Sequence, residues 1–216
     1  MSAVVLAACV AVTFVAGMLQ RLTGIGYGLV ATPILILTVG TDEAVKLVVV
    51  TGMMCSALAF WDTRAECRPW QIFPLVPFAL VAIWPAALLS TNASASLASL
   101  VVLVALAIAM HPRGIAVKSM WGEAAFAGSL SGAMNTVAAL GGPMAATYGI
   151  AQRWGASMVP NLQLFLVTTS LGVLCVRGWP ATTNSASLAL LAAAAVMGQQ
   201  SPVVSRDLST RVTPAI

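Results

Sequence analysis

The hydrophobic positions of this chain form long uninterrupted runs, and the charged residues stand between them. Charge-free runs extend over 1–20, 22–41, 47–61, 69–110, 124–152, 154–176 and 178–205. A helix needs ~20 apolar residues to cross the hydrocarbon core of a bilayer. The pattern predicts nine hydrophobic segments, or seven if each of two glycine-rich stretches interrupts a single helix, with approximate limits 2–19, 25–39, 44–61, 70–89, 94–110, 122–138, 142–152, 157–176 and 184–202.

The composition places these segments in a membrane. Of the 216 residues, 60% are hydrophobic and 7% are charged, and the mean hydropathy is +0.97, whereas soluble domains carry about 25% charged residues. We therefore predict an all-α polytopic membrane protein with a single membrane domain over 1–216. The four cysteines form no CxxC pair and the chain has one histidine, so we expect no metal site and no cofactor.

The basic residues predict the orientation of the segments. Arg64 and Arg68 precede the fourth segment, and Arg113 and Lys118 follow the fifth. The turn between these two segments, "STNAS" (90–94), is uncharged, so the positive-inside rule places both basic loops in the cytoplasm. Counting segments outward predicts a cell-membrane protein with its N-terminus outside and its C-terminus in the cytoplasm. The net charge of +4 is explained by this orientation, and we expect no nucleic-acid partner.

Two glycine-rich stretches are similar to each other. "FVAGMLQRLTGIGYGLVATPIL" (14–35) and "AFAGSLSGAMNTVAALGGPMAATYGI" (125–150) each begin with an Ala-Gly pair and continue to a glycine cluster. Because the two units enter from opposite sides, we predict an inverted repeat, the first about 2–110 and the second about 122–205. Matched interruptions in inverted halves indicate a transporter substrate site. The alternative is helix packing through small-xxx-small spacings.

The order of several motifs resembles that of one membrane transporter family. A "GxGYG…P" pattern over 24–33, then "ALGGPMAATYG" (139–149), Arg153 and "PNLQLFL" (160–166), is similar to the TauE/SafE family. The resemblance covers roughly 10–210 and implies a permease or exporter of sulfite and organosulfonates. "GQQSPVVSRDLSTRV" (198–212) resembles the loop before the last segment of the family, so we expect that segment to be missing. A homodimer would then cover the gap.

The interrupted helices predict a site for a small anion. A helix break leaves backbone N–H groups unpaired, glycine lets a ligand approach them, and the N-terminus of a half-helix carries a partial positive charge. Polar side chains nearby offer further donors, although such residues also serve to join helices. The candidate substrate-binding residues are Arg21, Thr23, Gly24, Gly26, Gly28, Asn135, Thr136, Gly141, Gly142, Asn161 and Gln163.

Two of the charged residues have alternative interpretations. Arg21 either lies in the anion site, which would offset the roughly 2.5–3.5 kcal/mol cost of a buried charge, or marks the cytoplasmic edge of the membrane. Lys46 follows Asp42 and Glu43, which favours an ion pair at the start of a helix over a coupling site.

The sequence also bears on other classes of function. It contains no HExxH, no GxSxG and no His/Asp cluster, so an integral membrane enzyme is not expected. The principal interpretation is a transporter of small anions that works by alternating access across the lipid bilayer. The alternative is a passive anion channel, or a non-transporting subunit that needs a partner.

Overall fold

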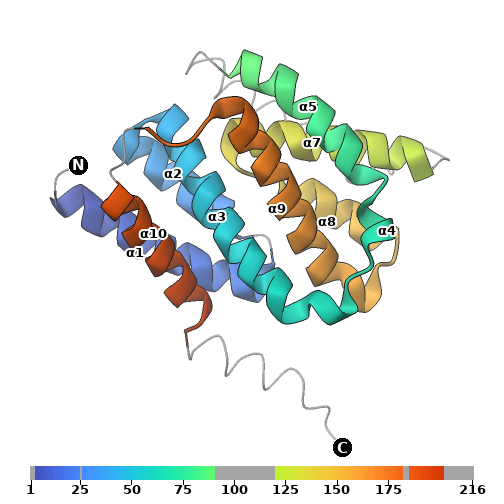
Figure 1. Ribbon diagram of the computed structural model, residues 1–216, viewed down its shortest axis with the longest axis horizontal. Coiled ribbons are helices and arrows are strands. Elements are labelled where there is room, and N and C mark those ends of the chain that lie inside the picture. The colour runs from blue at the N-terminus through green and yellow to red at the C-terminus, as the bar shows by residue number, and fades with distance from the viewer. Residues whose placement is uncertain (1–2, 25, 91–119, 182–184, 202–216) are drawn as a thin grey trace, which may run out of the picture.

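The computed structural model describes residues 3–24, 26–90, 120–181 and 185–201 (Figure 1). Within these ranges the chain is helical and contains no strand. Two short 3₁₀ turns, Arg64–Glu66 and Gly155–Ser157, connect longer elements. The α-helices are α1 (Ala3–Thr23), α2 (Tyr27–Val39), α3 (Thr41–Thr63), α4 (Pro69–Ile72), α5 (Leu75–Leu89), α7 (Met120–Ala138), α8 (Gly142–Ala151), α9 (Met158–Arg177) and α10 (Ser185–Gln199).

The helices follow the hydrophobic segments expected from the sequence. The expected segment 70–89 is divided, because α4 ends at Ile72 and Pro74 caps the start of α5. Proline has no backbone N–H to donate, so it is tolerated at the start of a helix but interrupts one that would run through it. The expected segment 94–110 and most of the "STNAS" turn lie outside the described residues.

Three helical stretches of the described chain are long and apolar enough to cross a membrane: Val5–Leu22, Thr41–Glu66 and Gly155–Arg177. The other apolar helices are shorter. At 1.5 Å per residue, the 13 residues of α2 extend about 20 Å and the 10 residues of α8 about 15 Å. Both are shorter than the ~30 Å hydrocarbon core of a bilayer, so neither crosses it alone.

Each glycine-rich stretch forms the tip of a helical hairpin. In the first hairpin α2 returns along α1, and the Cys9 sulfur near the start of α1 lies 3.6 Å from the Thr38 hydroxyl near the end of α2. In the second hairpin α8 returns along α7, and Gln152 at the C-cap of α8 donates a 2.7 Å hydrogen bond to Glu123 at the start of α7. The structure thus shows hairpins at both stretches, each with a break between its two helices.

The hairpins lie on either side of a central pair of long helices (Figure 1). Helices α3 and α9 pack against each other in the middle, α1 packs against α10 on one side, and α5 packs against α7 on the other. Glycines bring the backbones of the outer pairs together: a Cβ on Gly17 would lie 2.1 Å from the Ala195 carbonyl oxygen, and one on Gly132 would lie 2.2 Å from that of Ala79. Close packing through small residues is typical of membrane helices.

Ion pairs are found at both ends of α3. At its start, Asp42 pairs with Arg177 at the end of α9 at 2.6 Å, so α3 and α9 run antiparallel. Lys46 pairs with Asp42 and Glu43 at 2.5 and 3.4 Å, which confirms the expected ion pair at a helix start. At the other end of α3, Asp62 pairs with Arg21 at 2.8 Å. The charges of the long helices are thus concentrated at their ends.

Candidate functional site

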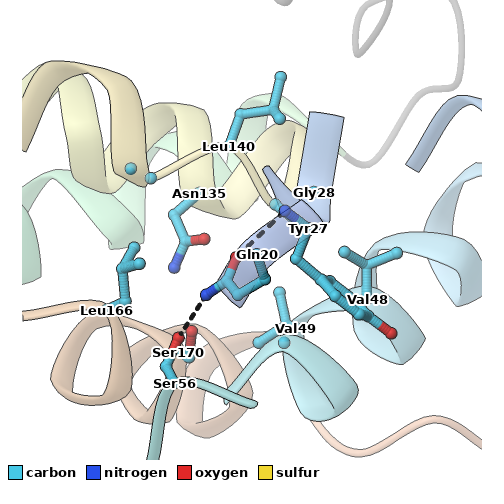
Figure 2. Close-up of a pocket in the computed structure, with 14 residues that line it drawn as sticks. Gln20, Tyr27, Gly28, Val48, Val49, Ser56, Asn135, Leu140, Leu166 and Ser170 are labelled. Atoms are coloured by element: carbon cyan, nitrogen blue, oxygen red, sulfur yellow. Dashed lines mark hydrogen bonds between the residues drawn. The ribbon is translucent and has the colours of Figure 1, made fainter. Parts of the chain in front are cut away.

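A cavity of about 40 Å³ lies where the two hairpin tips meet α3 and α9 (Figure 2). One water molecule requires roughly 10–15 Å³ of such volume, so the cavity has room for a small polar ligand. From α3 it is lined by residues 48–56 and from α9 by residues 166–170, which are the middle portions of both helices. The lining residues are Gln20, Tyr27, Gly28, Val48, Val49, Gly52, Ser56, Asn135, Ala139, Leu140, Gly141, Gly142, Leu166 and Ser170.

The backbone at both tips presents the N-terminus of a short helix to the cavity. Gly26 caps α2 and Gly141 caps α8, and as glycines neither has a side chain to cap its helix. The first N–H of α2, that of Tyr27, donates to the Gln20 side chain instead. The first N–H groups of a helix have no partner within the helix. The turns themselves depend on unusual backbone conformations, because Gly24 has φ +79° and Ala139 has φ +54°.

The two tips are in direct contact. A Cβ on Gly28 would lie 2.1 Å from the Ala139 carbonyl oxygen, so only glycine allows this approach. Beside it, the Thr32 hydroxyl of α2 donates a 2.9 Å hydrogen bond to the Ala138 carbonyl at the end of α7. Thr32 and Ala138 are 106 residues apart in the sequence, and the contacts between them and their neighbours hold the starts of α2 and α8 next to each other.

A network of side-chain amides fixes the first tip. The Gln20 side-chain oxygen accepts a 3.1 Å hydrogen bond from the Tyr27 backbone N–H. The Gln20 side-chain nitrogen donates to the Ser56 hydroxyl at 3.1 Å and to the Gln163 side-chain oxygen at 3.3 Å. Figure 2 shows the bonds to Tyr27 and Ser56. Gln163 in turn donates to the Gly24 carbonyl at 3.0 Å. The second tip is held in a similar way, because the Ser131 hydroxyl donates to the Gly141 carbonyl.

Two buried polar side chains at the cavity retain unused hydrogen-bonding capacity. Ser170 is 6% exposed and lines the cavity, and no hydrogen bond joins its hydroxyl to another described residue. Asn135 is 3% exposed; its nitrogen lies 3.4 Å from the Thr169 hydroxyl, and its oxygen has no partner among the described residues. Buried polar groups are normally satisfied, so these two indicate a place for a polar ligand or water.

Comparison with known proteins identifies the family. The sequence profile of the family described as "Sulfite exporter TauE/SafE" matches residues 9–215. The chain belongs to the TauE/SafE family. Members of this family are membrane transporters of the sulfite exporter type rather than enzymes. A comparison with curated proteins and another with solved structures found no match.

Five of the candidate residues expected from the sequence of this TauE/SafE protein surround the cavity or its tips. Gly28, Asn135, Gly141 and Gly142 line the cavity, and Gly26 caps the helix that points at it. Gly24 and Gln163 lie just behind the first tip, where they are bonded to each other. These residues come from α2, α7, α8 and α9 and from the turns at the hairpin tips, and the fold brings them together.

The remaining candidates lie elsewhere. Arg21 is paired with Asp62 and is not a lining residue of the cavity. The Thr136 hydroxyl bonds within its own helix, to the Gly132 carbonyl. The Asn161 side chain accepts from the Arg68 backbone N–H at 2.8 Å and donates to Gln71 at 2.7 Å, so it anchors the connection before α4. The side chain of Thr23 lies outside the described residues.

Sequence reasoning missed several residues that the structure places at the site. Gln20, Tyr27, Ser56 and Ser170 line the cavity, and Arg177 donates to the Thr136 carbonyl beside Asn135. Of these residues, Gln20 could have been recognised from the sequence, because it is a large polar amide in a run without charges, close to the first glycine cluster. Serine is too frequent in this chain for Ser56 or Ser170 to be recognised. Within the described ranges, no group of three His, Cys, Asp or Glu residues could hold a metal ion.

Proposed function

We propose that this TauE/SafE protein is a permease or exporter of small anions, with sulfite or organosulfonates as its substrates, and that it works by alternating access around the two hairpin tips. The observation that carries the proposal is the cavity between α3 and α9, at which the N-termini of two helices meet. Apart from the Tyr27 N–H, which donates to Gln20, each N-terminus offers backbone N–H groups that have no partner within their helix, and the positive end of a helix dipole. Such a place favours a small oxyanion.

The depth of the cavity supports a transport function. It lies near the midpoints of α3 and α9, the two long helices that pack at the centre of the protein. If both cross the bilayer, the anion site is near the midplane, where secondary transporters with broken helices bind their substrates. The ion pairs Asp42–Arg177 and Arg21–Asp62 then lie toward opposite ends of α3, on either side of the site.

The packing supports the proposed inverted repeat. The hairpin α1–α2 with α3 and α5 would correspond to α7–α8 with α9 and α10. Under that correspondence the pair α1/α10 matches the pair α7/α5, and the pair α3/α9 matches itself. These are the three helix pairs that pack most extensively in the described chain. Gly17 and Gly128 also correspond, and each lies against the backbone of the fourth helix of the other repeat, at Ala195 and Leu75.

The proposed orientation is tested by labelling Cys67, which lies between α3 and α4. In a variant with Cys9, Cys55 and Cys175 replaced by alanine, we expect a membrane-impermeant maleimide to label Cys67 in inverted membrane vesicles and not in intact cells. Burial raises the pKa of the Cys67 thiol, so less thiolate is present at neutral pH and the labelling rate rises as the pH is raised toward that pKa.

Labelling of Cys67 in intact cells would contradict the proposed orientation. A Cys67→Ala version of the same variant controls for reaction at other groups, and labelling of solubilised protein at the same pH shows that the thiol is reactive. Cys9 and Cys55 are buried. Alanine is chosen to replace them because it is smaller than cysteine by only one sulfur atom, so little packing volume is lost.

The transport proposal is tested by flux in proteoliposomes that hold the purified chain. We expect saturable, counter-transported flux of sulfite or an organosulfonate. In Ser170→Ala we expect that flux to fall several-fold, because one neutral hydrogen bond contributes about 0.5–1.5 kcal/mol. In Arg21→Ala we expect a change of less than about twofold, because Arg21 does not line the cavity and its partly exposed ion pair with Asp62 contributes only about 0–1 kcal/mol, to stability.

The outcomes separate the alternatives. Flux without saturation or counter-transport would favour a passive channel. Flux lost in Arg21→Ala but retained in Ser170→Ala would place Arg21 in the site instead of at the membrane edge. No flux of any anion above that of empty vesicles would contradict a transporter that acts alone and would favour a subunit that needs a partner.

A further inference from the structure

The residues that line the cavity carry no formal charge. All fourteen are apolar, glycine, or neutral polar residues. The two arginines that flank the cavity are both bonded elsewhere. Arg21, next to Gln20, pairs with Asp62 at 2.8 Å. Arg177 is 6% exposed; it donates to the Thr136 carbonyl, next to Asn135, and pairs with Asp42 at 2.6 Å. Each of these positive charges is thus matched by a carboxylate.

The positive potential in the cavity comes from the two helix starts. A helix N-terminus is equivalent to roughly +0.5 elementary charge, so the starts of α2 and α8 together supply about +1. That matches one negative charge on a ligand. The cost of moving an ion out of water grows with the square of its charge in the Born treatment. A dianion would therefore lose about four times as much hydration energy, and this site has no further cation to offset it.

The side chains at the cavity can complete the coordination of a singly charged oxyanion. The hydroxyl of Ser170 has the unused capacity described above. Ser56 accepts from Gln20 at 3.1 Å, and its own hydroxyl hydrogen has no acceptor within the described ranges. These are two neutral donors, from α9 and α3, around one small volume. Neutral donors bind oxygen atoms without supplying a second positive charge.

We propose that the cavity selects oxyanions with a single negative charge, which are hydrogensulfite and alkylsulfonates, over dianions such as sulfite in its fully ionised form and sulfate. This inference rests on the proposed transport function and names the charge state of its substrate. The charge selectivity makes sulfite transport dependent on pH, because hydrogensulfite loses its proton near neutral pH and the fraction of sulfite in that form then falls.

The test uses the full purified chain in proteoliposomes and three anions: methanesulfonate, which stays singly charged, sulfate, which stays doubly charged, and sulfite at about pH 6 and about pH 8. We expect saturable methanesulfonate flux that is equal at both pH values. Sulfate flux is expected to be at least about tenfold lower, which corresponds to ~1.4 kcal/mol. Sulfite flux is expected to fall from pH 6 to pH 8 in proportion to the hydrogensulfite fraction.

Empty vesicles at each pH correct for diffusion of uncharged sulfur dioxide, and calorimetric binding of the same anions in detergent gives a second readout that diffusion does not affect. Sulfate that binds and is transported as well as methanesulfonate, or sulfite flux that rises with pH, would overturn the charge selectivity while leaving an anion transporter in place. If none of the three anions is bound or transported, the proposed function fails, and this inference fails with it.

Discussion

Gly28→Ala is expected to separate the two hairpin tips and to abolish anion flux. The added Cβ would lie 2.1 Å from the Ala139 carbonyl oxygen and 3.1 Å from its carbonyl carbon. These are backbone atoms, and Ala139 is already held at φ +54°, so the second tip cannot yield easily. Overpacking of this kind costs typically 1–3 kcal/mol, and here it also moves the start of α2 away from the cavity.

The effect is measured as flux in proteoliposomes together with the thermal unfolding midpoint in detergent. Gly172→Ala in α9 is the matched control, because its Cβ would meet only the ends of the Leu80 and Ile83 side chains, at 2.7 and 2.9 Å. Those side chains can change rotamer. We expect Gly172→Ala to retain flux and to unfold near the wild-type temperature. A Gly28→Ala protein that behaves like this control would show that the tip contact is not needed.

The local features of this fold were visible in the sequence because they depend on residues close together in the chain. The similarity of the two glycine-rich stretches predicted two equivalent breaks, and in the structure Gly26 and Gly141 are the N-caps of two short helices. Glycine and proline determine such helix breaks locally. The division of segment 70–89 at Pro74 had the same kind of signal, but the unbroken hydrophobicity of the run favoured one continuous crossing.

The partners of the polar residues could not be predicted, because they are set by packing across the whole chain. Gln20 and Gln163 are 143 residues apart, and nothing near either amide indicates the other. Asn161 and Gln163 are two positions apart on α9, so they face different directions. One anchors the connection before α4 and the other supports the first hairpin tip. Their roles follow from helix rotation, which the hydrophobic pattern leaves open when a helix is apolar all round.

Gln20→Glu is expected to make transport of methanesulfonate dependent on pH. The substitution is nearly isosteric, and a carboxyl oxygen can still accept from the Tyr27 N–H at 3.1 Å. When ionised, the introduced carboxyl places a negative charge at the edge of the anion site. At about 5 Å and an effective dielectric constant of about 20, the repulsion is ~3 kcal/mol, or about a hundredfold in affinity.

The sign of the pH dependence follows from the titration of the introduced group. The introduced carboxyl group is protonated and neutral at low pH, and it becomes ionised as the pH rises through its pKa. Methanesulfonate keeps its single charge throughout. Flux in Gln20→Glu should therefore approach the wild-type value at low pH and fall as the pH is raised, while wild-type flux stays constant.

Gln20→Met separates charge from the loss of hydrogen bonds. Methionine has similar length and no formal charge, but it leaves the Tyr27 N–H, the Ser56 hydroxyl and the Gln163 oxygen without this partner. We expect flux in Gln20→Met to be reduced equally at every pH. If Gln20→Glu lost flux to the same extent at all pH values, the amide would act only by holding the hairpin tip. Recovery at low pH in Gln20→Glu alone would mean that the charge beside the start of α2 decides whether an anion binds.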